Sequence, residues 1–165
     1  LRVKAIYLPS SLTSSGKPQA LLPLSSDIDT KWLDRPLPQR LIVKYGPNNE
    51  NVGILVSTPG SVSAVLLAAE DISGMDAIES SLTHVLVGLL DAVGGVRVSQ
   101  SNDGDLTIRI SGSRLDGENV ALYEWLGTPL ASIVASIAAE AMDKPVRILE
   151  ETQNKKHIDI RIGVA

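Results

Sequence analysis

The most suggestive small-ligand feature of this sequence is the run Ser57-Thr58-Pro59-Gly60-Ser61, which leads from an apolar segment into a helical pattern. Free backbone amides and hydroxyl groups at a helix start can bind a phosphate or another anionic metabolite. The run lacks both the lysine of a nucleotide phosphate loop and the three-glycine dinucleotide pattern. Capping by Thr58, with Pro59 at the first helical position, is the alternative interpretation. The candidate anion-binding residues are Ser57, Thr58, Gly60 and Ser61.

The ionisable residues do not form a predicted catalytic or metal site. The chain has two histidines, of which His84 falls within a helical pattern and His157 opens a strand. Glu150 and Glu151 are adjacent, so they point to opposite faces of a strand unless a bulge intervenes. We therefore expect no catalytic residue, no metal and no cofactor, and we lean against an enzyme.

The composition restricts the classes of partner. The chain has no cysteine, which excludes disulfides and thiolate metal sites. Its 15 basic residues are scattered and are outnumbered by 19 acidic ones, so we expect no nucleic-acid partner. No apolar run reaches the roughly 20 residues of a membrane-spanning helix, and the first residues do not resemble a signal peptide. We expect a cytoplasmic protein without a membrane span.

The spacing of apolar residues predicts an α+β fold in which three main helices pack on antiparallel hairpins. The predicted hairpins pair residues 41–45 with 52–56, 96–100 with 106–110, and 146–151 with 157–162, and residues 2–8 predict a further strand. The predicted helices run from Thr58 to about Asp71, over about 75–93 with Gly94-Gly95 as a left-handed stop, and over 129–142, with a shorter helical turn in 120–126. The 165 residues suit a single domain.

Residues 9–39 differ from the rest of the chain because five prolines lie there among serine, threonine, aspartate and glycine. This composition predicts a Pro/Ser-rich loop or arm, with a helical turn around 28–33. Trp32 within it could anchor the arm to the domain or bind a partner to the arm. An arm that docks on another protein is one of our hypotheses for function.

The helix predicted over 129–142 alternates branched apolar residues with alanine and serine. Small side chains on more than one face permit two neighbours to approach closely. Burial between the chain's own sheet and helix is one interpretation, and a dimer contact or the wall of an apolar pocket is the other. Apolar residues of this helix and of the helix predicted over 75–93 are the candidate ligand-binding residues: Leu82, Leu86, Leu89, Leu130, Ile133 and Ile137.

From about residue 75 to 164 the chain resembles the ligand-binding domain shared by vinyl-reductase-like hydrocarbon-binding proteins and subunits of the TRAPP vesicle-tethering complex. The resemblance lies in Gly94-Gly95-Val96-Arg97-Val98 after a long helix, in Leu126-Gly127 before residues 129–142, and in 146–151 followed by 157–162. It implies an α+β domain whose helices dimerise or enclose an apolar cavity. The cysteines that such domains carry are absent, which puts a metal, redox or tetrapyrrole role in doubt.

These observations favour a non-catalytic domain that binds an apolar small molecule or a protein partner, and that forms a homodimer. The alternative is an enzyme or regulatory protein that binds a phosphate or anionic metabolite at Thr58–Ser61.

Overall fold

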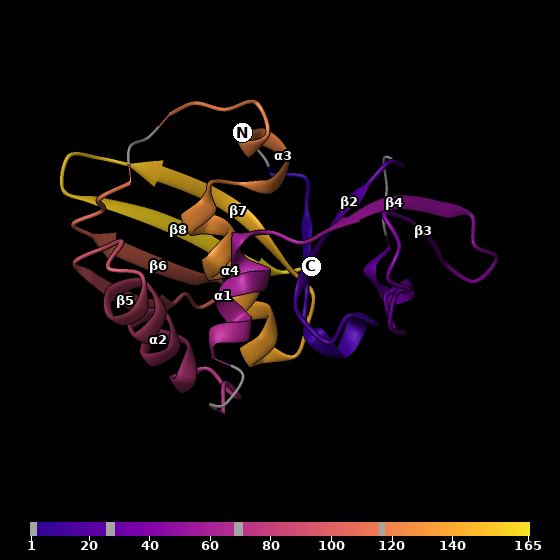
Figure 1. Ribbon diagram of the computed structural model, residues 1–165, viewed down its shortest axis with the longest axis horizontal. Coiled ribbons are helices and arrows are strands. Elements are labelled where there is room, and N and C mark those ends of the chain that lie inside the picture. Colours follow the sequence, from indigo (N-terminus) through magenta and orange to yellow (C-terminus); the bar gives the residue numbers. More distant parts are fainter. Residues whose placement is uncertain (1–2, 26–28, 68–70, 116–117) are drawn as a thin grey trace.

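The computed structural model describes residues 3–25, 29–67, 71–115 and 118–165. Within these residues, eight antiparallel strands form one sheet in the order β3-β4-β2-β1-β7-β8-β6-β5 (Figure 1). The strands are β1 (Ile6–Leu8), β2 (Gln19–Pro23), β3 (Ile42–Tyr45), β4 (Asn51–Val56), β5 (Gly95–Gln100), β6 (Leu106–Ser111), β7 (Val146–Gln153) and β8 (His157–Val164). The predicted hairpins β3–β4, β5–β6 and β7–β8 are confirmed.

Three main helices pack against this sheet, so the predicted α+β class is also confirmed. Short 3₁₀ turns lie in the part of the chain before β3, and a π-helix continues α2. The helical elements are α1 (Pro59–Leu66), α2 (Asp76–Thr83), α3 (Tyr123–Leu126), α4 (Pro129–Met142), the turns Ser10–Leu12 and Thr30–Trp32, and the π-helix His84–Leu89.

Helix α4 is the centre of the fold because it contacts β1, β7 and β8 on one side and α1 and α2 on the others. The Thr128 hydroxyl caps its start by accepting from the Ala131 N–H at 3.2 Å, and Asp143 ends it with a φ of 51°. Every residue from Leu130 to Ala139 is buried. The small residues of α4 are therefore buried between the chain's own sheet and its own helices.

Residues 9–39 supply β2, which pairs with β1 on one side and with β4 on the other. Leu21 of β2 lies opposite Ile6 and Leu55 in a second apolar core, on the sheet face away from α4. Leu33 and Leu37, further along the same segment, belong to this core as well. The segment predicted as a loop or arm is thus partly a central strand and partly the cover of one sheet face.

The helix predicted over 75–93 ends earlier than expected. Its α-helical part stops at Thr83, and the π-helix ends at Leu89 with the Leu90 N–H donating to the Val85 carbonyl at 2.8 Å. The left-handed residue that follows is Asp91, with a φ of 47°, so the prediction of a stop at Gly94-Gly95 is wrong. Gly94 instead starts the approach to β6, because its N–H donates to the Ser111 carbonyl at 2.8 Å.

Three other predicted boundaries fall partly on residues that the structure does not describe. Arg2 of the first predicted strand and Ile28 of the predicted turn lie outside the described residues, and β1 begins only at Ile6. Helix α1 ends at Leu66, residues 68–70 are outside the described part, and Asp71 lies beyond the helix.

The two edge strands of the sheet, β5 and β3, differ in the partners of their outward-facing backbone groups. At the β5 edge the Val98 N–H donates to Glu79 Oε2 of α2 at 2.8 Å, and Arg97 lies 3.8 Å from the same carboxylate. At the β3 edge, Leu55 of β4 donates to the Leu41 carbonyl at 2.8 Å. Because hydrogen-bonding residues alternate along an antiparallel strand, the backbone groups of Ile42 point away from the sheet.

On the sheet face away from α4, Arg109 of β6 forms a bidentate ion pair with Asp159 of β8, at 2.9 and 3.0 Å. The hydrogen bonds from Arg109 hold the pKa of Asp159 below its ordinary value. A lowered carboxyl pKa stabilises the folded state above the unfolded pKa of about 4 and loses this effect as the pH falls through the folded value.

We therefore expect Asp159→Asn to lower the urea midpoint slightly at pH 7 and to have a smaller effect at pH 3. The effect is small because the Arg109 side chain is 56% exposed and water screens the pair. Urea unfolding followed by circular dichroism at both pH values measures it. An equal decrease of the urea midpoint at pH 7 and at pH 3 would show that the charge of Asp159 does not stabilise the fold through its pair with Arg109.

Candidate functional site

The predicted anion-binding residues lie at the start of α1 but face the inside of the protein. Thr58, Gly60 and Ser61 are buried, and Gly60 lies against Ser132 and Ser136 of α4. The Thr58 N–H donates to Ser61 Oγ at 3.0 Å. The helix start is thus capped from within the chain.

Ser57, the fourth of these residues, is exposed, and its hydroxyl accepts from Gln19 Nε2 at 3.4 Å. The structure keeps the four residues adjacent but buries three of them, and Gly60 among these lies against α4. Pro59 is the first residue of α1, as the capping interpretation expects, but the buried Thr58 hydroxyl has no hydrogen-bond partner among the described residues.

Five of the six apolar candidate residues lie in the core where α2, its π-helical continuation and α4 meet the sheet. Leu82, Leu86 and Ile137 are fully buried, whereas Leu89 at the end of the π-helix is 49% exposed. None of the six lines either of the two pockets described below.

The two histidines lie on separate elements, His84 in the π-helix and His157 at the start of β8. His157 contacts the Asn154 side chain at 2.8 Å and lies 3.5 Å from Asp159. Among the described residues, no group of three or more histidine, aspartate or glutamate side chains could hold a metal ion.

Glu150 and Glu151 serve different contacts. A bulge in β7 between Ile148 and Glu150 shifts the register, after which Glu150 lies opposite Arg161 and Glu151 opposite Ile160. The two carboxylates therefore point to opposite sheet faces, as predicted. Glu151 Oε1 accepts from the Thr128 hydroxyl at 2.6 Å.

Tyr7 belongs to the same region at the start of α4. Its hydroxyl donates to the Leu126 carbonyl at 2.6 Å. Burial, and to a lesser extent the charge of Glu151, raises the pKa of Tyr7. A tyrosine with a raised pKa and a satisfied hydroxyl stays protonated at neutral pH, so this cluster fixes the loop before α4.

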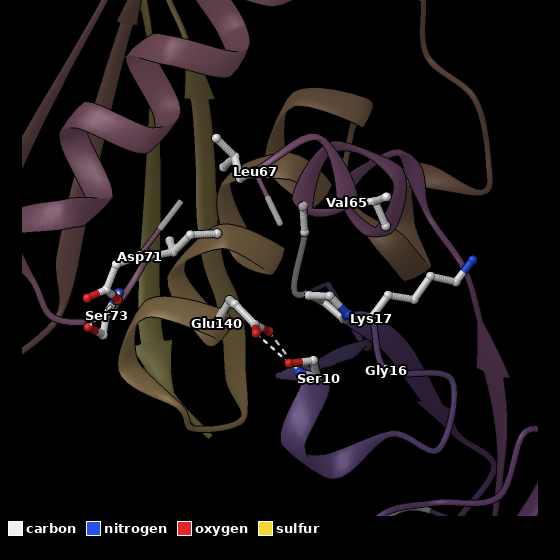
Figure 2. A pocket seen from close by; sticks show the side chains of 11 residues that line it. Ser10, Gly16, Lys17, Val65, Leu67, Asp71, Ser73 and Glu140 are labelled. Atoms are coloured by element: carbon white, nitrogen blue, oxygen red, sulfur yellow. Dashed lines mark hydrogen bonds between the residues drawn. The ribbon is translucent and has the colours of Figure 1, made fainter. Parts of the chain in front are cut away.

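The first pocket, of about 360 Å³, lies between the loop after β1, the end of α1, residues 71–73 and the end of α4 (Figure 2). We call it the α1 pocket. Its apolar wall comes from α1 and the residues that follow it, and its polar residues come from the other segments. The residues that define it here are Ser10, Lys17, Val65, Leu67, Asp71 and Glu140.

The carboxylates of the α1 pocket already have partners. Glu140 accepts from the Ser10 N–H at 2.8 Å and from the Ser10 hydroxyl. Asp71 accepts from the Ser73 hydroxyl at 2.6 Å and from its N–H at 3.0 Å, which lowers the pKa of Asp71. The lowered pKa makes Asp71 a poor proton donor at neutral pH. These groups are suited to recognition by charge.

The charges are arranged on opposite sides of the pocket. In Figure 2 the Lys17 side chain extends past Val65, away from Asp71 and Glu140. The rim therefore has a cationic side and an acidic side, with the apolar end of α1 between them.

Helix α1 itself carries apolar residues on two faces. Its inner face, which includes Gly60 and Ala64, is buried against α4. On the other side Val62, Val65 and Leu66 are 60%, 53% and 49% exposed, at the helical spacing i, i+3 and i+4. We call these three residues the α1 outer face. Val65 belongs to both the outer face and the α1 pocket.

Sequence analysis missed this site because four separate segments build it. The available signal was that residues 62–67 contain a single polar side chain, Ser63, which leaves the predicted helix apolar on every side.

No family model, curated protein or solved structure matches this chain. Function therefore has to be argued from the site, since a fold alone does not define it.

One stretch, Tyr123–Met142, is long and apolar enough to cross a membrane by length and composition. It consists of α3 and α4, which are separated at Gly127 with a φ of 77°. About two thirds of the most apolar window is buried within the protein, as in the core helix of a soluble domain.

Proposed function

We propose that this chain is a non-catalytic interaction domain that associates with a second copy of itself through the α1 outer face. One observation carries the proposal: α1 is packed against α4 on one side and exposes three aliphatic side chains on the other. A surface helix of a soluble protein normally presents charged or polar residues to water. Clustered exposed apolar side chains are typical of a surface that another molecule covers.

The charges beside α1 favour a second copy as that molecule. In a two-fold interface the same patch meets itself, so a cationic flank on one chain meets the acidic flank of the other. Lys17 and Asp71 lie on opposite sides of the α1 pocket and permit this pairing. Complementary charge of this kind fixes orientation and suppresses wrong partners.

An interface of standard size buries roughly 800 Å² on each partner. Helix α1 has eight residues, so the rim of the α1 pocket has to contribute as well. The three aliphatic residues would form the dry centre, and Lys17, Asp71 and Glu140 the polar rim.

The sequence favoured a domain that binds either an apolar small molecule or a protein partner. We propose the second of these, with another copy of the chain as the partner. An apolar guest among Leu82, Leu86 and Ile137 would have to displace fully buried core side chains. Dimerising helices are also what the resemblance to hydrocarbon-binding and tethering-complex domains implies. A cytoplasmic location belongs to the same proposal and accords with a chain that has no cysteine.

The test is the solution mass, measured by light scattering after gel filtration across a concentration series. We expect twice the mass of one chain, and we expect Val65→Asp to weaken association at least about tenfold, or about 1.4 kcal/mol, because it places a charge at the interface centre. Val164→Asp is the matched control, since Val164 is 56% exposed at the end of β8.

A charge exchange tests the two-fold arrangement separately. Lys17→Glu should weaken the dimer by setting two acidic flanks against each other, and adding Asp71→Lys should restore it. A monomeric unaltered chain at 1 mM, on the order of the weakest relevant affinity, would end the proposal. So would a dimer that responds equally to Val65→Asp and Val164→Asp.

A further inference from the structure

A second pocket, of about 370 Å³, lies between the segment that follows η2 and the β3–β4 hairpin. Here η2 is the 3₁₀ turn Thr30–Trp32, and we call the cavity the hairpin pocket. Two aromatic residues, Trp32 and Tyr45, and two cationic residues, Arg35 and Lys44, are among those that line it. The whole chain has only two tryptophans and three tyrosines and no phenylalanine. Two of its five aromatic residues therefore meet at one small cavity.

One of the two aromatic residues, Tyr45, belongs to the second core. It is 3% exposed and packs with Leu33 and with Leu37, which lines the pocket too. Trp32 ends the 3₁₀ turn, where its N–H donates to the Asp29 carbonyl at 3.1 Å. A pocket whose walls are fixed before binding loses less entropy when a ligand enters.

Proline restricts the rest of the wall. Pro36, Pro38 and Pro47 all line the cavity, and each fixes its own φ near −65°. Gly46 makes the turn into the hairpin tip with a φ of 97°, a conformation that other residues rarely adopt.

The cations of the hairpin pocket are available. Lys44 has no ion-pair partner within the described part of the chain. Arg35 lies 3.7 Å from Asp34, but both side chains are mostly exposed, so the pair is weak. Asp34 lines the pocket as well, so its lining has two cations and one carboxylate, a local excess of positive charge in a chain of net charge −4.

We infer that the hairpin pocket binds a small planar anion, an aromatic ring that carries a carboxylate or a phosphate. The ring would stack on Trp32 and the anionic group would pair with Arg35 and Lys44. Aromatic side chains favour offset or edge contacts with another ring, and charged hydrogen bonds to an oxyanion are the strongest in proteins. A cavity of this volume lies within the range of small-molecule sites. The site is separate from the α1 outer face.

Trp32 provides the measurement. In a Trp125→Phe variant it is the sole tryptophan, and its fluorescence can be titrated with benzoate and with adenosine 5′-monophosphate. Benzamide and adenosine are the matched neutral probes. We expect a saturable change with a Kd at or below about 1 mM for at least one anion, and binding of its neutral counterpart at least about tenfold weaker. Which anion binds tells a carboxylate site from a phosphate site.

Two variants that each remove two positive charges separate local pairing from overall charge. Arg35→Gln with Lys44→Gln should weaken anion binding at least about tenfold. Lys155→Gln with Lys156→Gln, at the β7–β8 turn, should leave it unchanged. If Trp125→Phe does not fold, the indole N–H signal of Trp32 in the unaltered chain reports the same titration by NMR.

No saturable change with either anion up to about 10 mM, tenfold above the expected Kd, would overturn the inference. Equal binding of a neutral probe, or an equal loss in both double variants, would do so too. None of these outcomes bears on self-association through α1.

Discussion

Replacing Gly60 with alanine should lower the free energy of unfolding by about 3 kcal/mol, the upper end of the usual cost of overpacking. A Cβ atom at Gly60 would overlap the Ser132 carbonyl oxygen and the Ser136 hydroxyl, and would lie 2.7 Å from Ser136 Cβ. The serine hydroxyl can rotate away. The carbonyl cannot move without shifting α4, which the sheet holds in place, so α1 has to withdraw.

Gly88→Ala is the matched control for this prediction. A Cβ atom there would meet only His84 Nδ1, at 3.9 Å, so the change should stay within about 0.5 kcal/mol of the unaltered chain. Urea unfolding followed by circular dichroism measures both variants. Equal midpoints for Gly60→Ala and Gly88→Ala would show that α1 and α4 do not approach as closely as described.

Replacing residues 9–39 with a flexible linker should abolish cooperative unfolding. The deletion removes β2, and the sheet then loses the strand that joins β1 to the β3–β4 hairpin. It also uncovers Ile6 and Leu8, which are fully buried in the second core. Thermal unfolding and the near-ultraviolet circular dichroism spectrum would register the loss.

Two leucine substitutions in the same half of the sheet test, without a deletion, whether residues 9–39 contribute to the folded core. Leu21 is fully buried and Leu41 is 65% exposed. Leu21→Ala should cost about 2–5 kcal/mol, and Leu41→Ala should stay within about 0.5 kcal/mol of the unaltered chain. A deletion variant that still unfolds cooperatively would instead favour the hypothesis that residues 9–39 are an arm for docking on another protein.

The elements that sequence analysis predicted correctly have local causes. The hairpins β5–β6 and β7–β8 alternate apolar and polar residues because one sheet face is open to water. Helix α4 has its cap at Thr128, proline at the first position and aspartate at the end. Each of these signals lies within a few residues of the element that it defines.

Strand β2 could not be recognised in this way. Its residues Gln19–Pro23 are bounded by prolines, show little alternation and pair with strands far away in the sequence. The sheet order, in which β1 joins the two halves, likewise depends on tertiary packing. The π-helix ends at Leu89, Asp91 takes a left-handed conformation and Gly94 then joins β6, and the sequence reveals none of these features.

The candidate site was harder to predict than the fold. The apolar pattern of Leu82, Leu86 and Ile137 indicates burial, but a pattern cannot tell a core from a ligand pocket. The sequence shows that α1 is largely apolar, but it does not show which side of α1 packs against α4. Both pockets combine the region before β3 with later segments, so the long Pro/Ser-rich stretch hid both of them.

The contrast between the two edge strands affects how copies of this chain can stack by backbone pairing. Glu79 occupies one backbone donor of β5, that of Val98, and so obstructs an incoming strand at that edge. The backbone of Ile42 leaves the opposite edge accessible. Pairing through the β3 edge alone would join two copies and then stop. A dimer formed through the α1 outer face would present two β3 edges, so stacking through β3 would then continue from one dimer to the next.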